Sequence, residues 1–217
     1  MGKKLLIIPI IHSEEELGSL KDRISGIKEE KLGSEVHKKQ IEEVHKLWRD
    51  IAGTISEIMQ IIKPEKIQIF QDGMPAGGET GEKIVRECAA NRSINYVILA
   101  EMINSGAEIE QTESPQYLKE EYDIIREIFS AKSPEEQNKL SLKYREKLHG
   151  LGINRDRFIA ERINSSLKEG YTGILFIGAT HNITPGLSDE INYYIYNYDR
   201  RAAIHWINDG VDNQNNL

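Results

Sequence analysis

The chain has 217 residues, a length that suits one α/β domain or one domain with a helical insertion. Its 39 % hydrophobic and 29 % charged residues are typical of an ordinary globular protein and argue against a disordered one. The net charge of −7 argues against a general nucleic-acid binder, which needs a basic surface. The single cysteine, Cys88, excludes an internal disulfide and fits a reducing compartment.

A first buried strand is predicted over residues 5–11, an apolar run that ends at His12. Pro9 has no N–H to donate to a sheet ladder, so the strand is expected to stop near Ile8. The start of the chain superficially imitates a secretory signal, but no small-residue cleavage site follows. No stretch approaches the roughly 18 apolar residues of a membrane span. We therefore expect a cytoplasmic protein without a membrane partner.

A long amphipathic helix is predicted from Ser34, a favourable N-cap, to Ile62. This apolar stripe suits either the protein's own sheet or a partner, including a second copy of the chain. Burial on the sheet is the expected outcome, and a homo-oligomer stays open. The stripe recurs in steps of three and four residues, at Ile41, Val44, Trp48, Ile51, Ile55, Ile58 and Ile62.

Residues 67–70 form a second predicted strand, and Asp72 follows its carboxyl end. The loop 72–81 is rich in glycine and superficially resembles a phosphate-binding loop. The P-loop pattern needs glycine before its lysine and serine or threonine after it, but Glu82 and Ile84 occupy these positions. A nucleotide P-loop is therefore rejected.

The next three segments are a predicted helix, a segment with two possible structures and a short predicted strand. A helix is expected over residues 80–91. Residues 94–104 are apolar enough for a strand or a helix, and both interpretations stay open. Residues 107–111 alternate between apolar and polar side chains, which predicts a short strand.

Two Ser-Pro pairs, at residues 114–115 and 133–134, each combine an N-cap residue with proline at the first helical position. The second pair also has the glutamate of a capping box. Glycines within residues 149–152 are expected to end the second helix. The chain thus makes a helical excursion over residues 115–168. We expect three helices, over residues 115–129, 134–149 and 154–168.

Residues 173–177 are almost wholly apolar, which is typical of a parallel strand covered on both faces. The run stops at Gly178, and His181 follows three residues later. A last strand is predicted over the aromatic segment 193–198. These elements predict a single α/β domain, residues 1–217, with a mostly parallel central sheet flanked by helices.

Polar side chains follow three of the predicted strands, namely His12, Asp72 and His181. Because ligands bind beyond the carboxyl ends of parallel strands, these side chains are expected to meet at one edge of the sheet. Two imidazoles and a carboxylate are a common ligand set for a divalent transition metal such as manganese, cobalt or zinc.

Four short pieces of the chain carry a resemblance to a known superfamily. They are an early strand ending in histidine, an acid after the next strand, a late helix opening with Arg-Asp, and a final G-x-x-H. This pattern resembles the TraB, Tiki, ChaN and erythromycin-esterase-like proteins. The resemblance implies metal-dependent peptide cleavage, ester hydrolysis, or haem or iron association. The matching pieces are residues 10–12, 70–72, 154–160 and 178–181.

The chain departs from the superfamily's pattern at two positions. Pro9 stands where the first motif usually has glycine, and Gln71 stands where a glutamate usually follows the second strand. Asp72 or Glu79 is expected to supply the acid in its place. Glu113, beyond the predicted short strand, is a further candidate.

Arg155 opens the late helix and has two interpretations. Its guanidinium could hold a substrate carboxylate or stabilise a developing oxyanion. It could instead pair with Asp156 or Glu161 within its own helix.

The leading hypothesis is a metal-dependent hydrolase of peptide or ester bonds. His12, His181 and Asp72 would hold the metal, which lowers the pKa of its bound water toward neutrality, and Arg155 would assist. Without a metal, one histidine could act as general base. The alternative is a non-catalytic protein that binds a small ligand, haem or iron in the same cleft. A third hypothesis is an interaction protein that docks a partner on helix 34–62.

Overall fold

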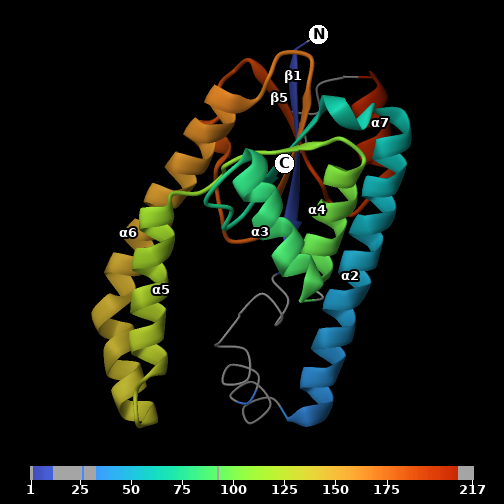
Figure 1. Ribbon diagram of the computed structural model, residues 1–217. Coiled ribbons are helices and arrows are strands. Elements are labelled where there is room, and N and C mark those ends of the chain that lie inside the picture. Colours follow the sequence, from blue (N-terminus) through green and yellow to red (C-terminus); the bar gives the residue numbers. More distant parts are fainter. Residues whose placement is uncertain (1, 12–25, 27–32, 92, 210–217) are drawn as a thin grey trace.

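The computed structural model describes residues 2–11, 26, 33–91 and 93–209 (Figure 1). Within these residues, five strands form one sheet in the order β3-β2-β4-β1-β5, and every pair of neighbours is parallel. The predicted α/β fold with a parallel central sheet is therefore confirmed. The strands are β1 (Lys3–Ile10), β2 (Ile67–Gln71), β3 (Glu108–Ile109), β4 (Thr172–Gly178) and β5 (Ile191–Ile195).

Helices cover both faces of this sheet. Figure 1 shows α5 and α6 side by side as a hairpin that extends past the end of the sheet, while α2, α3, α4 and α7 lie on the opposite side. Two short 3-10 helices, Pro64–Lys66 and Thr184–Gly186, complete the connections. The α-helices are α2 (Ser34–Ile61), α3 (Gly78–Ala90), α4 (Ile94–Asn104), α5 (Pro115–Phe129), α6 (Pro134–Ser166) and α7 (Arg200–Asp209).

The central strand β1 supplies both layers of the core, because successive side chains of a strand point to opposite faces. Leu6 and Ile8 are fully buried in the layer formed with α2, α4 and α7. Leu5 lies in the layer formed with α6. Trp48 of α2 is fully buried in the first layer. The apolar stripe of the long helix therefore packs on the protein's own sheet, as expected.

Pro9 does not end the first strand, contrary to the prediction. Ile7 O accepts a hydrogen bond from Tyr196 N on the β5 side, and Ile10 O accepts one from Ala179 N on the β4 side. Backbone groups alternate between the two sides, so Pro9 faces the β5 side, where pairing has already ended at Ile7. The missing N–H thus costs no ladder bond, and β1 continues to Ile10.

The glycines near residue 150 do not interrupt α6, which is one continuous helix instead of the two that were predicted. Neither Gly150 nor Gly152 has a positive φ, so both have ordinary helical backbone. A glycine inside a helix costs about 1 kcal/mol relative to alanine, which weakens a helix without ending it. Packing of α6 against α5 and the sheet offsets that cost.

Three further segments can be compared with the sequence prediction. The ambiguous segment 94–104 is helical and forms α4. The short strand comprises only Glu108–Ile109. The last strand is Ile191–Ile195 instead of 193–198, and Tyr198, three residues beyond it, turns the chain with a φ of 65°. The helix that follows, α7, was not predicted; the Asp199 carboxylate caps it by accepting from Arg201 N at 3.0 Å.

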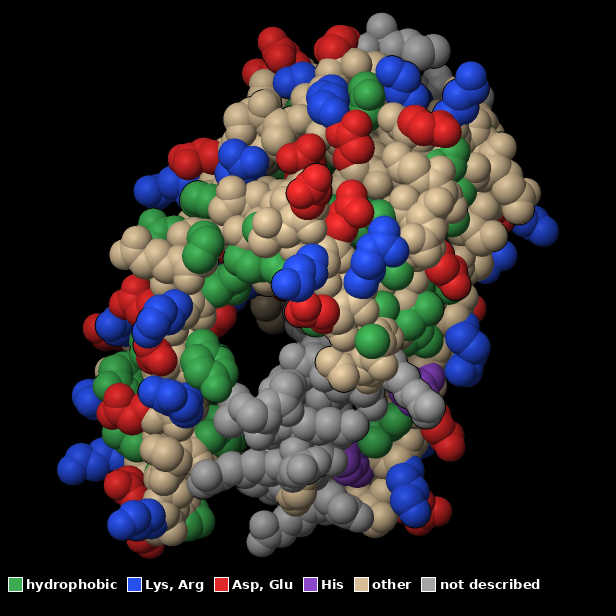
Figure 2. All heavy atoms as spheres, viewed as in Figure 1, with side chains coloured by type: hydrophobic (Ala, Val, Ile, Leu, Met, Phe, Trp, Pro, Cys, Tyr) green, Lys and Arg blue, Asp and Glu red, His purple; other side chains and the backbone are tan. Residues whose placement is uncertain are grey.

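The surface of the described residues carries charges of both signs. Figure 2 shows Lys and Arg side chains interspersed with Asp and Glu side chains over the face that it draws. Several pairs are helical neighbours at i,i+4, such as Lys119 with Asp123 and Arg86 with Glu82. Within the described ranges, none of the helices combines the length and the apolar character that crossing a bilayer requires.

Candidate functional site

The carboxyl ends of β2 and β4 bring the first two candidate residues together, because these strands are neighbours in the sheet. Asp72 directly follows β2, and its Oδ2 accepts a hydrogen bond from Gly178 N at the end of β4, at 3.0 Å. His181 leaves the same end of β4, and its Nε2 lies 3.5 Å from Asp72 Oδ2. The predicted convergence at one edge of the sheet therefore holds for Asp72 and His181.

A second acid joins Asp72 and His181 from the neighbouring strand end. The loop after β3 is tied to the loop after β2, because Thr112 N and Glu113 N both donate to Met74 O, at 3.0 and 2.9 Å. This contact places Glu113 beside Asp72 in the interior, where Glu113 is 0 % exposed. Donor atoms of Asp72, Glu113 and His181 all lie within 4.8 Å of one another. We call these three residues the triad.

Arg155 of α6 is the buried cation of this region. Its Nη2 donates to Asp72 Oδ1 at 2.8 Å and to Glu113 Oε1 at 2.5 Å, and its Nε donates to Glu113 Oε1 at 3.0 Å. Its Nη1 donates to Glu121 Oε2, on α5, at 2.6 Å. Arg155 thus pairs with acids from other elements rather than with Asp156 or Glu161, the partners considered from the sequence.

Burial and charge act on the pKa values of Glu113 and Arg155 in opposite directions, but the pKa of each group ends above its usual value. Burial raises the pKa of Glu113 above its usual range, and the hydrogen bond and charge of Arg155 only partly counter this. The negative charge of Asp72 raises the pKa of Glu113 further. For Arg155, burial lowers the pKa, but the hydrogen bond and charge of Glu113 and the charges of Glu121 and Asp72 more than offset it. The guanidinium stays charged, and Glu113 retains a proton more readily than an exposed glutamate.

Glu113 also has an unsatisfied oxygen. Its Oε2 is buried, and none of the residues that the structure describes donates a hydrogen bond to it. Gln71, which precedes Asp72, likewise has a buried Oε1 that no described residue reaches. Buried polar atoms are normally hydrogen-bonded, and each exception calls for an explanation.

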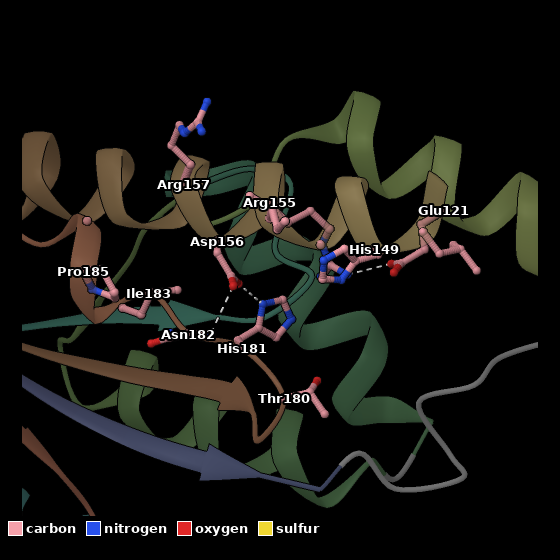
Figure 3. Close-up of a pocket in the computed structure, with 14 residues that line it drawn as sticks. Glu121, His149, Arg155, Asp156, Arg157, Thr180, His181, Asn182, Ile183 and Pro185 are labelled. Atoms are coloured by element: carbon pink, nitrogen blue, oxygen red, sulfur yellow. Dashed lines mark hydrogen bonds and ion pairs between the residues drawn. The ribbon is translucent and has the colours of Figure 1, made fainter. Parts of the chain in front are cut away.

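His181 has a second carboxylate partner, which the sequence analysis did not assign to it. Its Nδ1 lies 2.5 Å from Oδ1 of Asp156, on α6. The other carboxylate oxygen of Asp156 accepts from Asn182 N at 3.0 Å. Figure 3 shows Asp156 pointing from the helix onto the loop that carries His181 and Asn182, with both contacts dashed.

A cavity of about 780 Å³ adjoins the triad. Figure 3 shows it between α6 and the loop after β4, with His181 and Asp156 directed into it. His181, Arg155, Asp156 and Glu121 line it, whereas Asp72 and Glu113 lie behind them. Its remaining lining combines polar groups such as Thr180 and Asn182 with apolar ones such as Ile153, Ile183 and Pro185.

The remaining candidate residues lie elsewhere. Glu79 is exposed in the first turn of α3 and does not belong to the triad. His12 lies outside the described residues, so the predicted pairing of two histidines stays a prediction. Of the candidate acids, Asp72 and Glu113 therefore are the two that the structure brings to His181.

Two site residues escaped the sequence analysis for different reasons. Asp156 had a usable signal, because it directly follows Arg155 in the Arg-Asp pair. Neighbouring residues on a helix point about 100° apart, so two such residues can serve two faces of one site. Glu121 had no local signal, because only the packing of α5 on α6 brings it to Arg155.

The fold and the site together define an α/β protein with a buried acid, arginine and histidine cluster at the carboxyl edge of a parallel sheet. Comparison with protein-family models, with curated proteins and with solved structures produced no match. The argument for function therefore rests on the chemistry of the site.

Proposed function

We propose that this protein is a metal-dependent hydrolase of peptide or ester bonds, and that Asp72, Glu113 and His181 hold a divalent transition metal ion. The observation that carries the proposal is the buried Oε2 of Glu113, which no described residue satisfies, in a triad whose donor atoms lie within 4.8 Å. Glu113, one of the candidate acids of the sequence analysis, supplies the second carboxylate, and a contribution from His12 stays a prediction.

The charge of the cluster supports a cation. Four carboxylates, from Asp72, Glu113, Glu121 and Asp156, contact the single guanidinium of Arg155 or the imidazole of His181. If all four are ionised and the imidazole is neutral, three negative charges stay uncompensated. Asp72 and Glu113 are the buried pair among the four and share one guanidinium, so a proton on Glu113 or a bound cation would offset the charge that remains in the interior. Burial, and to a smaller extent the negative charge of Asp72, raise the pKa of Glu113, so an ionised Glu113 would gain from a bound cation.

The triad also fits the size of such an ion. Zinc ligands of the nitrogen and oxygen type lie about 2.0–2.2 Å from the ion, so two ligands of a tetrahedral site are about 3.4 Å apart. His181 Nε2 and Asp72 Oδ2 already lie 3.5 Å apart, and the other donor atoms of the triad, all within 4.8 Å of one another, need to close by at most about 1.4 Å to reach that tetrahedral spacing. Imidazole and carboxylate together suit zinc, cobalt and manganese.

A bound ion of this kind lowers the pKa of its water and polarises a carbonyl group. The chain itself supplies the place for the substrate, since the cavity opens directly beside His181. Thr180 and Asn182 offer hydrogen-bonding groups to a peptide or ester, and Ile153 and Ile183 offer an apolar wall. The fixed charge of Arg155 lies where it can stabilise negative charge that develops on a carbonyl oxygen.

We also keep the proposal that the chain is a divergent relative of the TraB, Tiki, ChaN and erythromycin-esterase-like proteins. In its support, the Arg-Asp pair and the histidine of the final G-x-x-H belong to one connected cluster. We propose a small-molecule or peptide substrate and a cytoplasmic location, the latter on the single Cys88 alone.

The test is metal binding by the untagged protein and by a conservative variant. We expect protein purified without added metal to retain, or to take up stoichiometrically, zinc, cobalt or manganese. Glu113→Gln keeps the shape of the side chain but removes its charge, so the metal affinity should fall at least tenfold. Glu79→Gln, which removes an exposed acid, is the matched control and should bind as the wild type does. Equal affinity in Glu113→Gln, or no binding by the wild type, would reject the metal site.

Turnover separates the enzyme from the non-catalytic alternative. The metal-loaded protein should hydrolyse a member of an ester and peptide panel, and His181→Ala should lose most of that activity while retaining its fold. Activity that survives in His181→Ala would exclude the catalytic assignment. Stoichiometric metal binding without turnover would instead favour a binding protein for a small ligand, haem or iron.

A further inference from the structure

We infer that Asp156 is a positioning residue that holds His181 in the tautomer with its proton on Nδ1, so that the Nε2 lone pair faces the triad. The consequence for metal binding rests on the proposed function, whereas the tautomer itself does not. Neither the strand-end pattern nor the resemblance to known proteins assigns this role to Asp156.

The first step is the contact between Asp156 and the imidazole. An ionised carboxylate can only accept hydrogen bonds, so the 2.5 Å contact between Asp156 Oδ1 and His181 Nδ1 requires a proton on Nδ1. A neutral imidazole then has its lone pair on Nε2. That atom lies 3.5 Å from Asp72 Oδ2 and therefore faces the triad.

The second step is the contact of Asp156 with the loop backbone. Its Oδ2 accepts from Asn182 N at 3.0 Å, so one carboxylate fixes both the ring of His181 and the next peptide unit. The loop therefore cannot turn without breaking both contacts of Asp156. A carboxylate that holds the remote nitrogen of a histidine ligand is the common way in which proteins fix its tautomer and its orientation.

Asp156 can hold His181 although it is the direct neighbour of Arg155. Successive residues of a helix point about 100° apart. Arg155 thus reaches the acids that follow β2 and β3, while Asp156 reaches the loop that follows β4. Arg155 therefore binds the two acids of the triad, and Asp156 binds its histidine.

The change Asp156→Asn tests the inference because an amide has one acceptor atom and one donor group. If its oxygen accepts from Asn182 N, its NH₂ group faces His181 Nδ1, which must then accept and move its proton to Nε2. If the amide is reversed, two donors meet at Asn182. We therefore expect Asp156→Asn to shift His181 from the Nδ1–H to the Nε2–H tautomer.

The measurement is the pair of imidazole ¹⁵N chemical shifts of His181 in metal-free protein, assigned by their loss in His181→Gln. The wild type should show the Nδ1–H form, and Asp156→Asn should show mainly the Nε2–H form. Asp156→Glu, which keeps the carboxylate, should restore Nδ1–H at least in part. Glu161→Gln removes an exposed acid from the same helix and should leave the shifts unchanged.

Metal affinity gives a second readout. Zinc or cobalt should bind Asp156→Asn about 10–100-fold more weakly than the wild type, as is typical for partners of metal-bound histidines. An unchanged tautomer in Asp156→Asn would overturn the inference, including where the variant merely melts at a lower temperature. If the tautomer shifts but neither protein binds metal, the positioning role stands and the proposed metal site fails.

Discussion

Glu113 is the residue on which the proposed site most depends, and the sequence alone offered it as only one of several acids. Nothing in the residues around it distinguishes it from the other glutamates of the chain. Its special environment comes from two backbone contacts with Met74 and from full burial behind Arg155. Asp72 and His181 were easier to find, because Asp72 directly follows an apolar strand and His181 comes three residues after the end of another.

The raised pKa of Glu113 predicts how stability depends on pH in protein kept free of metal with a chelator. Below the pKa of an unfolded glutamate, about 4.3, both states hold the proton. Above it the unfolded chain releases its proton first, so the folded state loses stability as the pH rises through the folded pKa. Glu113→Gln has no such proton and should lack this loss.

The measurement is the free energy of unfolding in urea between pH 4 and pH 8 for both proteins. Glu113→Gln should gain stability relative to the wild type as the pH rises. Glu79→Gln controls for the loss of one exposed charge. Curves that stay parallel for the wild type and Glu113→Gln would contradict the raised pKa.

At the scale of elements, the periodicity of apolar residues predicted the burial of α2 but not the structure of α4 or the length of α6. The stripe of α2 is continuous, so its burial could be predicted, and Trp48 is indeed fully buried. The segment of α4 is apolar over most of its length and its polar residues follow no one-sided pattern, so periodicity could not separate helix from strand. The continuity of α6 could not be predicted, because Gly150 is compatible with both a loop and a helix.

The continuous course of α6 makes a prediction about its glycines. Gly150 has helical backbone, and a Cβ added there would meet no atom within 4 Å. Gly150→Ala should therefore stabilise the protein by about 0.5–1 kcal/mol, because alanine loses less backbone entropy in a helix. The quantity to measure is the free energy of unfolding in urea.

Gly170 is the matched control, since it also has open space around it but a φ of +74°. Gly170→Ala should destabilise the protein by about 1–2 kcal/mol, the cost of left-handed backbone for an L-residue. If Gly150→Ala destabilised the protein as well, the chain would turn at residue 150, and the two shorter helices predicted from the sequence would be correct.

At the scale of the whole molecule, the site joins segments that are distant in sequence. Arg155 alone links α6 to Asp72 after β2, to Glu113 after β3 and to Glu121 of α5. The position of Asp72 could be predicted from the sequence, because the carboxyl ends of parallel strands lie at the same edge of the sheet. The hairpin of α5 and α6 contributes Glu121 and Arg155 itself, and no local pattern indicates where a hairpin will dock.

Arg155 is therefore predicted to hold the hairpin against the sheet. Arg155→Ala leaves Asp72 and Glu113 buried without their shared cation, and breaking a buried pair in this way costs about 3–5 kcal/mol. Arg157→Ala, two residues further along the same helix, removes an exposed arginine and should change stability by less than about 0.5 kcal/mol. Urea unfolding at pH 7 gives both values.

Amide hydrogen exchange locates the effect in the molecule. Because Glu121 binds Arg155 Nη1, the loss of Arg155 should speed exchange in α5 more than in α2, which packs on the opposite face of the sheet. The edge contact between Tyr117 and Phe158 survives the change, so α5 should loosen rather than detach. Equal stabilities of Arg155→Ala and Arg157→Ala, with α5 exchange unchanged, would show that the hairpin docks without the buried ion pairs.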